Sequence, residues 1–498
     1  MTGAAPRTLD RLLDPWFPGA GQQPIKGVTL DSREVEPGFL FMALAGSRAH
    51  GLDFLEQALA GGAAAVIYEP AETVDVAAAA AACRQRQVAL VSLPGLGGLA
   101  SAIAGRFYDD PSTRLRLIGV TGTDGKTSVS QFIAQCLDVD GRCGVIGTLG
   151  SGFPGGLTAT THTTPDPVTV QRLLAEFAEG AAASAVMEVS SHALDQGRVD
   201  GLHFNTAVLT NLGRDHLDYH GTVSAYEAAK RRLFEHPGLE AAVLNLDDDM
   251  GRRLREGLRG LRLIGYSLEA ANDAAVSATE IKAEATGLTL QACVDGACDR
   301  VHVPLIGRFN AYNVLATLGA LVASGLEKSR ALARLSRIRP VPGRMEPFGG
   351  GEGRPTVIVD YAHTPGALEA ALTALRAHVE GRIWCVFGCG GDRDPGKRPL
   401  MGQVARAGAE YLVLTNDNPR SEDAETILAQ IRAGTGGGDD VRVIPDRAEA
   451  IRAACREAGP GDAVLVAGKG HEDYQIIGAD RLAFSDRETV SRIVEELA

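Results

Sequence analysis

The sequence predicts an α/β protein of three domains, whose central domain has a mostly parallel sheet of P-loop type flanked by helices. The first observation is an apolar run at residues 117–120 that ends in a Gly-rich turn and continues into apolar residues at helical spacing. The second is the alternation of strand-like and helix-like segments that follows, which is typical of a parallel sheet. The third is that four apolar strands of the C-terminal region each end in a polar cluster, at 360–363, 388–394, 415–420 and 468–473, which favours a Rossmann-like α/β domain there.

The chain has 498 residues, which is too long for one hydrophobic core, so we expect three domains. The predicted division is a smaller N-terminal α/β domain at 1–110, a central domain at 111–338 and a C-terminal domain at 339–498. The last boundary rests on the Pro/Gly break at residues 340–343, which suits a hinge.

Composition excludes several classes of partner. With 49 Lys and Arg against 62 Asp and Glu, the net charge is −13, which argues against binding to nucleic acid or to an anionic membrane. The N-terminus lacks a basic and then apolar leader, and no apolar run approaches ~18 residues, so we expect a cytoplasmic protein without stable membrane insertion. The eight cysteines are scattered without C-x-x-C spacing, which predicts reduced thiols and no zinc or redox motif.

The turn after the apolar run at 117–120 has the composition of a phosphate cradle. Its backbone N–H groups and the start of the following helix would face an anion, while Lys126 adds a cation and the Thr127 hydroxyl can complete a Mg²⁺ shell. The loop sequence departs from the standard G-x-x-x-x-G-K-[ST] motif, because Val120 occupies the position of the first glycine. We predict that eight residues of this loop bind phosphate groups: Thr121, Gly122, Thr123, Asp124, Gly125, Lys126, Thr127 and Ser128.

Polar clusters also follow the later apolar runs of the central domain. Because the carboxyl ends of parallel strands share one crevice, these clusters should converge on the phosphate cradle. Glu188 and His216 are therefore candidate ligands for a second metal ion. A Ser–His hydrolase is disfavoured, since Ser191 and His192 are neighbours that point apart along a strand.

Two further alternatives concern single residues in these clusters. A zinc site at His216 and His220 is disfavoured, because the spacing lacks the glutamate of H-E-x-x-H. Lys230, taken alone, is most simply a solvated helix lysine.

Several segments resemble the Mur ligase family. The loop at 121–127 is similar to the family's ATP loop, with Asp124 where the family usually has Asn. The segment D-S-R at 31–33, the motif Y-x-x-A-K ending at Lys230 and the G-x-F-N-x-x-N motif at 307–313 match as well. The D-N-P-R run at 417–420 is the most discriminating match.

The resemblance implies residues for the nucleotide and the metals. It adds Asn310, Asn313 and Arg344 to the ATP site, with Arg344 reaching the γ-phosphate. It implies two Mg²⁺ ions and a carbamate formed from CO₂ on Lys230. The implied metal ligands are Thr127, Glu188, His216 and carbamylated Lys230. The implied catalytic residues are Lys126, Glu188, His216, Lys230, Arg344 and Asp360.

The resemblance also implies two substrate sites. The UDP-linked substrate would be contacted by Ser32, Thr163, Thr164, Ser190, Gln196 and Arg198, with His162 where the family commonly has Asn. The amino-acid substrate would be held by Arg393, Asp417, Asn418, Pro419, Arg420, Gly468 and Glu472. In this pocket Arg420 would grip a carboxylate in a bidentate fork. The alternative for Arg420 is a structural salt bridge to Glu422 or Asp423.

The implied activity is ATP-dependent addition of the third stem residue of peptidoglycan to UDP-MurNAc-L-Ala-D-Glu through an acyl phosphate. The implied amino acid is meso-2,6-diaminopimelate, and the protein is expected to act as a monomer. Alternatives are the same ligation with L-lysine or L-ornithine, a ligase like folylpolyglutamate synthase, or an ATP-binding regulatory module without catalysis.

Overall fold

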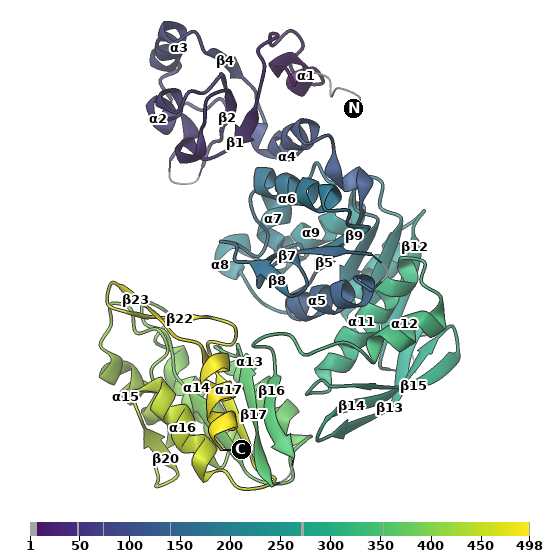
Figure 1. The fold of residues 1–498 in the computed structure, drawn as a ribbon, viewed down its shortest axis with the longest axis vertical. Coiled ribbons are helices and arrows are strands. Elements are labelled where there is room, and N and C mark those ends of the chain that lie inside the picture. The colour runs from purple at the N-terminus through teal and green to yellow at the C-terminus, as the bar shows by residue number, and fades with distance from the viewer. Residues whose placement is uncertain are drawn as a thin grey trace. The chain divides into compact units, whose positions relative to one another are not determined.

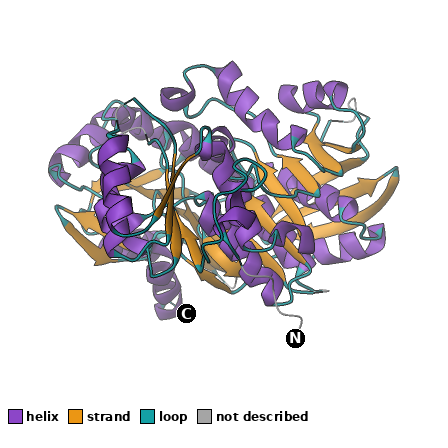
Figure 2. Cartoon of the chain, turned by 90° about the horizontal axis from the view of Figure 1, so that it is seen from above, coloured by secondary structure: helices purple, strands orange, loops and turns teal. Residues whose placement is uncertain are grey.

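The structure, a computed structural model, describes residues 7–46, 49–72, 74–139, 141–269, 273–351 and 353–497. It contains two compact units, which are described separately below. The first comprises Met1–Ile264 with Ala323–Gly325, and the second comprises Gly265–Val322 with Leu326–Ala498. Figure 1 labels the helices and strands of both, and Figure 2 distinguishes helices from strands by colour.

The N-terminal part of the first unit is a four-stranded parallel sheet with apolar clusters on both faces. Leu40 and Met42 belong to one cluster and Phe41 and Ala43 to another, because successive side chains of a strand point to opposite faces. Such two-sided burial explains the continuous apolar runs. The elements are β1 (Gly27–Thr29), β2 (Phe39–Ala43), β3 (Ala65–Tyr68) and β4 (Ala89–Ser92), with α1 (Leu9–Leu13), α2 (Leu55–Ala60), α3 (Val76–Gln85) and α4 (Leu96–Phe107).

The rest of the first unit contains a mostly parallel sheet. Its strands follow the order β11-β10-β5-β9-β6-β7-β8, and only β6-β7 and β7-β8 pair antiparallel. In Figure 1, α5 and α6 lie on opposite sides of β5 and β9. The strands are β5 (Arg116–Thr121), β6 (Cys143–Gly147), β7 (Gly150–Phe153), β8 (Gly156–Thr158), β9 (Ser184–Glu188), β10 (Thr206–Leu209) and β11 (Ala241–Asn245). The helices are α5 (Lys126–Leu137), α6 (Pro167–Glu179), α7 (Ser191–Asp195), α8 (Leu217–His220), α9 (Val223–Arg231) and α10 (Asp249–Gly257).

The chain enters the second unit within β12 (Arg262–Ser267) and forms an antiparallel meander of three strands before two helices. His378, from the C-terminal part, joins the meander to the segment before the first of these helices. Its Nδ1 lies 2.7 Å from the Glu284 carbonyl oxygen, and Gly307 N donates to its Nε2 at 2.9 Å. The elements are β13 (Val276–Glu284), β14 (Gly287–Val294), β15 (Ala297–Val303), α11 (Phe309–Ala323) and α12 (Lys328–Leu335).

The C-terminal part of the second unit is a six-stranded sheet in the order β16-β17-β21-β18-β19-β20, parallel except at β16-β17. A separate hairpin of β22 and β23 follows it. The strands are β16 (Glu346–Gly351), β17 (Arg354–Asp360), β18 (Ile383–Phe387), β19 (Tyr411–Leu414), β20 (Val441–Val443), β21 (Ala463–Ala467), β22 (Tyr474–Ile477) and β23 (Asp480–Ala483). The helices are α13 (Pro365–Arg376), α14 (Lys397–Gly408), α15 (Ala424–Thr435), α16 (Arg447–Glu457) and α17 (Asp486–Glu496).

The predicted α/β class, the mostly parallel central sheet and the strands at the four C-terminal clusters are confirmed. One local expectation is wrong: Ser191 and His192 do not continue a strand, because β9 ends at Glu188 and Ser190 caps helix α7. Among the described residues, no helix is long and apolar enough to cross a membrane.

The prediction of reduced thiols is wrong for one pair of cysteines. Cys293 and Cys298 are joined by a disulfide in the β14-β15 hairpin. They are direct cross-strand partners in the register of this hairpin, with Cα atoms 4.0 Å apart. The other six cysteines are buried and belong to no disulfide among the described residues. The sequence spacing alone could not reveal the pair, because the contact depends on the strand register.

Candidate active site

The predicted strand, Gly-rich loop and helix are present, and the loop of the predicted phosphate cradle joins β5 to the start of α5. Gly122 has φ 148°, and a Cβ added there would lie 1.8 Å from the Thr210 hydroxyl oxygen, so only glycine fits. Gly125, with φ 80°, is the N-cap of α5. The two residues that follow the neighbouring strand β10 hold the loop. Asp124 N donates to Asn211 Oδ1 at 3.0 Å, and Thr210 Oγ1 donates to Asp124 O. The Asp124 side chain is exposed.

Two lysines meet at one carbonyl group of this loop. Lys126 Nζ donates to Gly122 O at 2.8 Å and to Thr123 O at 2.9 Å. Lys230 Nζ, from α9, donates to the same Gly122 O at 2.7 Å. The expectation that Lys230 is a solvated helix lysine, when it is considered alone, is wrong, since only 1% of its surface is exposed.

The environment of Lys230 changes its acidity. Burial, and then the nearby Lys126 ammonium, lower the pKa of Lys230 well below its ordinary value. A lysine with a depressed pKa exposes a neutral amine lone pair, which is the nucleophilic form. The ring of Tyr226 packs against the amine, with its centroid 4.4 Å from Nζ.

Glu188 lies beside the cradle, where both of its carboxylate oxygens accept hydrogen bonds. Thr127 Oγ1 donates to Glu188 Oε2 at 2.9 Å, and Thr148 donates through its backbone N to Oε1 at 2.8 Å and through its hydroxyl to Oε2 at 3.1 Å. Thr127 and Glu188, separated by 61 residues in sequence, are therefore in contact. Hydroxyl and carboxylate oxygens are the ligands that Mg²⁺ takes, in small number beside waters and phosphates, so this donor set fits that ion.

His216 lies on an exposed loop before α8, with its ring centroid 6.2 Å from that of Tyr226. Its ring centroid is 4.7 Å from that of His192, and its Nε2 is 3.4 Å from Asp215 Oδ2. The other histidine of the disfavoured zinc pair, His220, has its Nε2 3.0 Å from Ser191 Oγ. In the part of the chain that the structure describes, no three His, Cys, Asp or Glu side chains are grouped to hold a metal ion.

Five of the six residues predicted for the UDP-linked substrate form one connected network. Thr163 Oγ1 is 3.0 Å from Thr148 Oγ1, which links it to Glu188. Thr164 Oγ1 donates to Glu188 O at 2.8 Å and accepts from Ser190 N at 3.0 Å. Arg198 completes the group by donating to Thr164 O at 2.7 Å and to Gln196 Oε1 at 3.0 Å.

The sixth residue, Ser32, lies in the N-terminal sheet region. Its hydroxyl donates to Gln57 Oε1 at 2.8 Å, and only 8% of its surface is exposed. Asp31 caps the short 3-10 helix that carries it, by accepting from Arg33 N at 2.9 Å.

In the second unit, Asn310 and Asn313 begin helix α11 and bond to each other. Asn310 Nδ2 donates to Ile306 O at 2.8 Å, and Asn313 Nδ2 donates to Asn310 Oδ1 at 2.8 Å. Both side chains are buried, so the amides hold the start of this helix in one arrangement.

The junction after residue 340 is tied to the first C-terminal strands. Asp360 accepts from Met345 N at 2.7 Å and from Ala362 N at 2.8 Å. Burial raises the pKa of Asp360 above its ordinary value, although these N–H groups and Arg344 oppose the shift. The Arg344 guanidinium lies over the ring of Tyr361, 4.4 Å from its centroid.

The four predicted polar clusters follow β17, β21, β18 and β19, which are neighbours in the sheet, so they share one edge. The loops interlock through backbone atoms. Gly391 N donates to Asn418 O at 2.9 Å, and a Cβ at Gly391 would lie 1.8 Å from Pro419 O. A Cβ at Gly468, whose φ is 118°, would lie 2.7 Å from Asp417 Oδ2.

Arg420 lies at this edge and forms no ion pair with an acidic side chain among the described residues. Its Nη1 donates to Gly391 O at 2.7 Å. The alternative of a salt bridge to Glu422 or Asp423 is wrong, because Glu422 pairs with Arg398 at 2.8 Å and Asp423 caps α15.

Two other residues predicted for the amino-acid pocket are hydrogen-bonded to each other, whereas a third is exposed. Asn418 Nδ2 donates to Glu472 Oε2 at 3.1 Å, although the two residues are 54 positions apart in sequence. Arg393 is exposed on its loop.

Sequence reasoning missed three groups beneath these loops and one beside Glu188. Lys469 is fully buried, Arg447 and Asp486 form a fully buried ion pair, and Thr148 binds Glu188. Lys469 and Thr148 could have been identified from the sequence, because each follows the carboxyl end of an apolar strand. The burial of Arg447 could not have been predicted in this way, since an arginine at the start of a helix is ordinarily exposed.

Three family models match the chain in order. They are "Mur ligase family, catalytic domain" at residues 24–96, "Mur ligase middle domain" at 120–321 and "Mur ligase, glutamate ligase domain" at 343–470. Together they match more than half of its residues. The chain belongs to the Mur ligase family.

Named relatives match over nearly the whole length. The chain is 54% identical over 493 residues, 98% of this chain and 99% of the relative, to the UDP-N-acetylmuramoyl-L-alanyl-D-glutamate--2,6-diaminopimelate ligase of Alkalilimnicola ehrlichii. It is 49% identical to the protein of the same name from Pseudomonas aeruginosa, over 94% of each chain. A solved structure titled as this ligase has a TM-score of 0.74 and 37% identity over 99% of each chain. These matches confirm the fold class.

Proposed function

We propose that this chain is an ATP-dependent ligase that joins meso-2,6-diaminopimelate to UDP-MurNAc-L-Ala-D-Glu in peptidoglycan synthesis. The observation that carries the proposal is the identity of 54% and 49%, over nearly full length, to two proteins named as 2,6-diaminopimelate ligases. The geometry supports the proposal independently. The predicted phosphate cradle follows the carboxyl end of the parallel strand β5. Arg420, which forms no ion pair among the described residues, follows the carboxyl end of the parallel strand β19.

The proposed reaction has two steps. The D-Glu side-chain carboxylate attacks the γ-phosphorus of ATP, so that an acyl phosphate forms and ADP leaves. The α-amine of the diamino acid then attacks the acyl carbon, a C–N bond forms, phosphate leaves and the amine proton passes to solvent. Phosphoryl transfer of this kind depends on positioning and electrostatic stabilisation.

Several residues would serve the phosphoryl transfer. Lys126 and Arg344 would supply positive charge to the transferring group. The loop from Thr121 to Ser128 and the amides of Asn310 and Asn313 would bind ATP. Asp360, which holds the backbone after Arg344 through Met345 N, would keep that arginine in place.

We propose two Mg²⁺ ions, held by Thr127, Glu188, His216 and a carbamate on Lys230. When bound, these ions would neutralise the charge of the phosphates. The depressed pKa and the burial of Lys230 favour the carbamate, because the neutral amine nitrogen can attack CO₂ and lose a proton to form the carbamate anion. The lysine thereby gains the oxygen ligands that Mg²⁺ prefers.

The network of Thr163, Thr164, Ser190, Gln196 and Arg198 would orient the UDP-linked substrate, with Ser32 contacting it from the N-terminal domain. We also keep the division into domains at 1–110, 111–338 and 339–498, which the three separate family matches support. We propose that the protein acts in the cytoplasm, where ATP is supplied, and that it acts as a monomer.

In the amino-acid pocket, Arg420 would bind the carboxylate that diaminopimelate carries at its distal end and that lysine and ornithine lack. The support for this role is that Arg420 contacts a backbone carbonyl while Glu422 and Asp423 are engaged elsewhere. A guanidinium with donors left over is suited to a bidentate carboxylate. The residues that would complete the pocket are Asp417, Asn418, Pro419, Gly468, Glu472 and Arg393.

Arg420→Ala should erase most of the preference for diaminopimelate over L-lysine. A charge-assisted hydrogen bond contributes about 1.5–3 kcal/mol, so the wild type should favour diaminopimelate by roughly ten- to a hundredfold in kcat/KM. The variant should lose this factor by turning over diaminopimelate poorly, with little change for lysine. The measurement is kcat/KM for diaminopimelate, L-lysine and L-ornithine.

The matched control is Arg432→Ala, which changes an arginine in the last turn of α15, away from these loops, and should leave all three values unchanged. A wild-type enzyme that prefers L-lysine or L-ornithine would contradict the proposed amino acid, while the ligase class would stand.

A further inference from the structure

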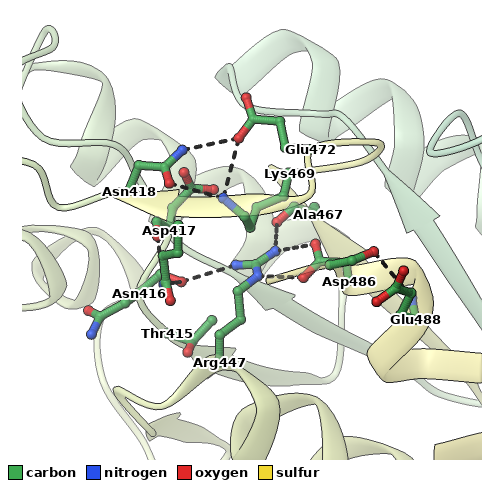
Figure 3. Close-up of polar contacts among 12 residues, drawn as sticks. Thr415, Asn416, Asp417, Asn418, Arg447, Ala467, Lys469, Glu472, Asp486 and Glu488 are labelled. Carbon is green, nitrogen blue, oxygen red and sulfur yellow. Dashed lines mark hydrogen bonds and ion pairs between the residues drawn. The ribbon is translucent and has the colours of Figure 1, made fainter. Parts of the chain in front are cut away.

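Lys469 is a fully buried cation at the edge of the proposed amino-acid pocket. It follows β21, and its side chain is 0% exposed. Nζ donates to Asn418 Oδ1 at 3.0 Å and lies 3.3 Å from Glu472 Oε2, as Figure 3 shows. The ring centroid of Tyr474 lies 5.5 Å from Nζ, within the range of a cation–π contact. A buried lysine is retained only where such partners compensate its charge.

This ammonium determines how the Asn418 amide is oriented. Asn418 Oδ1 accepts from Lys469 Nζ and also from Ile476 N, each at 3.0 Å, so both of its lone pairs are used. Nδ2 donates one hydrogen to the Glu472 carboxylate at 3.1 Å. The second Nδ2 hydrogen has no acceptor among the described residues, so the Asn418 side chain can only donate to a ligand. A carboxylate is an acceptor of the kind that such a donor needs.

The same ammonium orients the Glu472 carboxylate. Lys469 and Asn418 both donate to its Oε2, and no hydrogen bond to Oε1 occurs among the described residues. The buried cation also compensates the negative charge of this half-buried side chain. Oε1 is therefore suited to a ligand ammonium, and a diamino acid carries one at its distal end in addition to the reacting amine.

A buried ion pair holds the loop that carries Lys469. The fully buried pair of Arg447 and Asp486 is bidentate, with distances of 2.7 Å from Nε to Oδ1 and from Nη2 to Oδ2. Arg447 also donates to Asn416 O at 3.3 Å and to Ala467 O at 2.9 Å, which are the backbone groups just before Asn418 and Lys469 (Figure 3). The loops that carry Asn418 and Lys469 are thus held to one buried guanidinium.

We infer that Lys469 is a positioning residue that sets specificity in the amino-acid pocket. It fixes Asn418 as a donor for a ligand carboxylate and Glu472 as an acceptor for a ligand ammonium. This inference rests on the proposed function, because it names what recognises the zwitterionic distal end of the diamino acid. It differs from a purely structural ion pair in predicting a selective effect on one substrate.

The test measures KM for each of the three substrates in wild type and in Lys469→Met, which approximates the length of the side chain and removes its charge. We expect KM for diaminopimelate to rise about ten- to a hundredfold, with a smaller change in kcat. KM for ATP and for the UDP-linked substrate should stay within about twofold of the wild-type values. Lys328→Met, on helix α12, is the matched control and should leave all three KM values unchanged.

A double-mutant cycle separates positioning from general packing. Because Lys469 acts in part through Glu472, Lys469→Met combined with Glu472→Gln should raise KM for diaminopimelate by less than the product of the two separate effects. Lys469→Arg, which retains a cation, should recover part of the loss and also serves if Lys469→Met fails to fold. The combination of Lys469→Arg with Glu472→Gln then completes the cycle.

Additive effects in the cycle, or equal increases in all three KM values with a lowered Tm, would overturn the inference. An unchanged KM for diaminopimelate in Lys469→Met would do so as well. Failure of the proposed function is recognised separately, because the wild-type enzyme would then form no product with diaminopimelate.

Discussion

Lys126→Ala should reduce ligation by about a hundred- to a thousandfold or more, the largest loss we expect from a single change. The cradle otherwise offers only neutral donors from the backbone and from Thr127, so the variant would lose the cation that faces the developing phosphoryl charge. The measurement is phosphate release under saturating ATP, with the UDP-linked substrate and diaminopimelate present.

The control for Lys126→Ala is Lys328→Ala, which removes a helix lysine outside the cradle and should keep wild-type turnover. The Tm of both variants should stay close to that of the wild type, since the Lys126 contacts described above are to carbonyl groups of its own loop. Near-wild-type turnover of Lys126→Ala would refute the role of this loop in ATP binding.

Lys230→Ala should abolish activity in a way that added bicarbonate cannot restore. The amine that would carry the carbamate is gone, whereas a short carboxylic acid should partly replace the oxygens of the proposed carbamate. The wild-type enzyme should differ, because its proposed carbamate would form from the neutral amine. Lowering the pH through the depressed pKa of Lys230 should protonate the amine and reduce activity, and bicarbonate should restore part of it.

The measurements for Lys230→Ala are turnover with and without bicarbonate or acetate, and the mass of the wild-type protein with CO₂ present. A gain of one carboxyl group that is absent from the variant is expected. A Lys230→Ala enzyme that binds Mg²⁺ and turns over normally would show that the lysine has only a packing role.

Much of the site could be predicted because it lies where apolar runs end. Glu188 is the last residue of β9, the predicted phosphate cradle follows β5, and the D-N-P-R loop follows β19. The end of each apolar run can be recognised in the local sequence. The rule that parallel strands present their carboxyl ends at one edge then brings the ends within each sheet together. Thr127 and Glu188 meet in this way across 61 residues.

The parts that could not be predicted depend on contacts between distant side chains. The buried pair of Arg447 and Asp486 joins the starts of two helices 39 residues apart, and no local pattern marks it. The ion-pair partner of Glu422 is Arg398 on helix α14, and this contact excludes the alternative pair of Glu422 with Arg420. The cysteines at 293 and 298 required the strand register in the same way.

The proposal is tested most directly by the substrate dependence of phosphate release in the unmodified enzyme. ATP, UDP-MurNAc-L-Ala-D-Glu and Mg²⁺ would be supplied with meso-diaminopimelate, L-lysine, L-ornithine or no amino acid, and the nucleotide product would be weighed by mass spectrometry. We predict that meso-diaminopimelate gives sustained phosphate release and a product heavier by one diaminopimelyl residue, that L-lysine and L-ornithine react roughly ten- to a hundredfold less efficiently, and that the mixture without amino acid gives no amide product. Phosphate release that does not depend on the UDP-linked substrate, or no product with any amino acid, would contradict the proposed ligase.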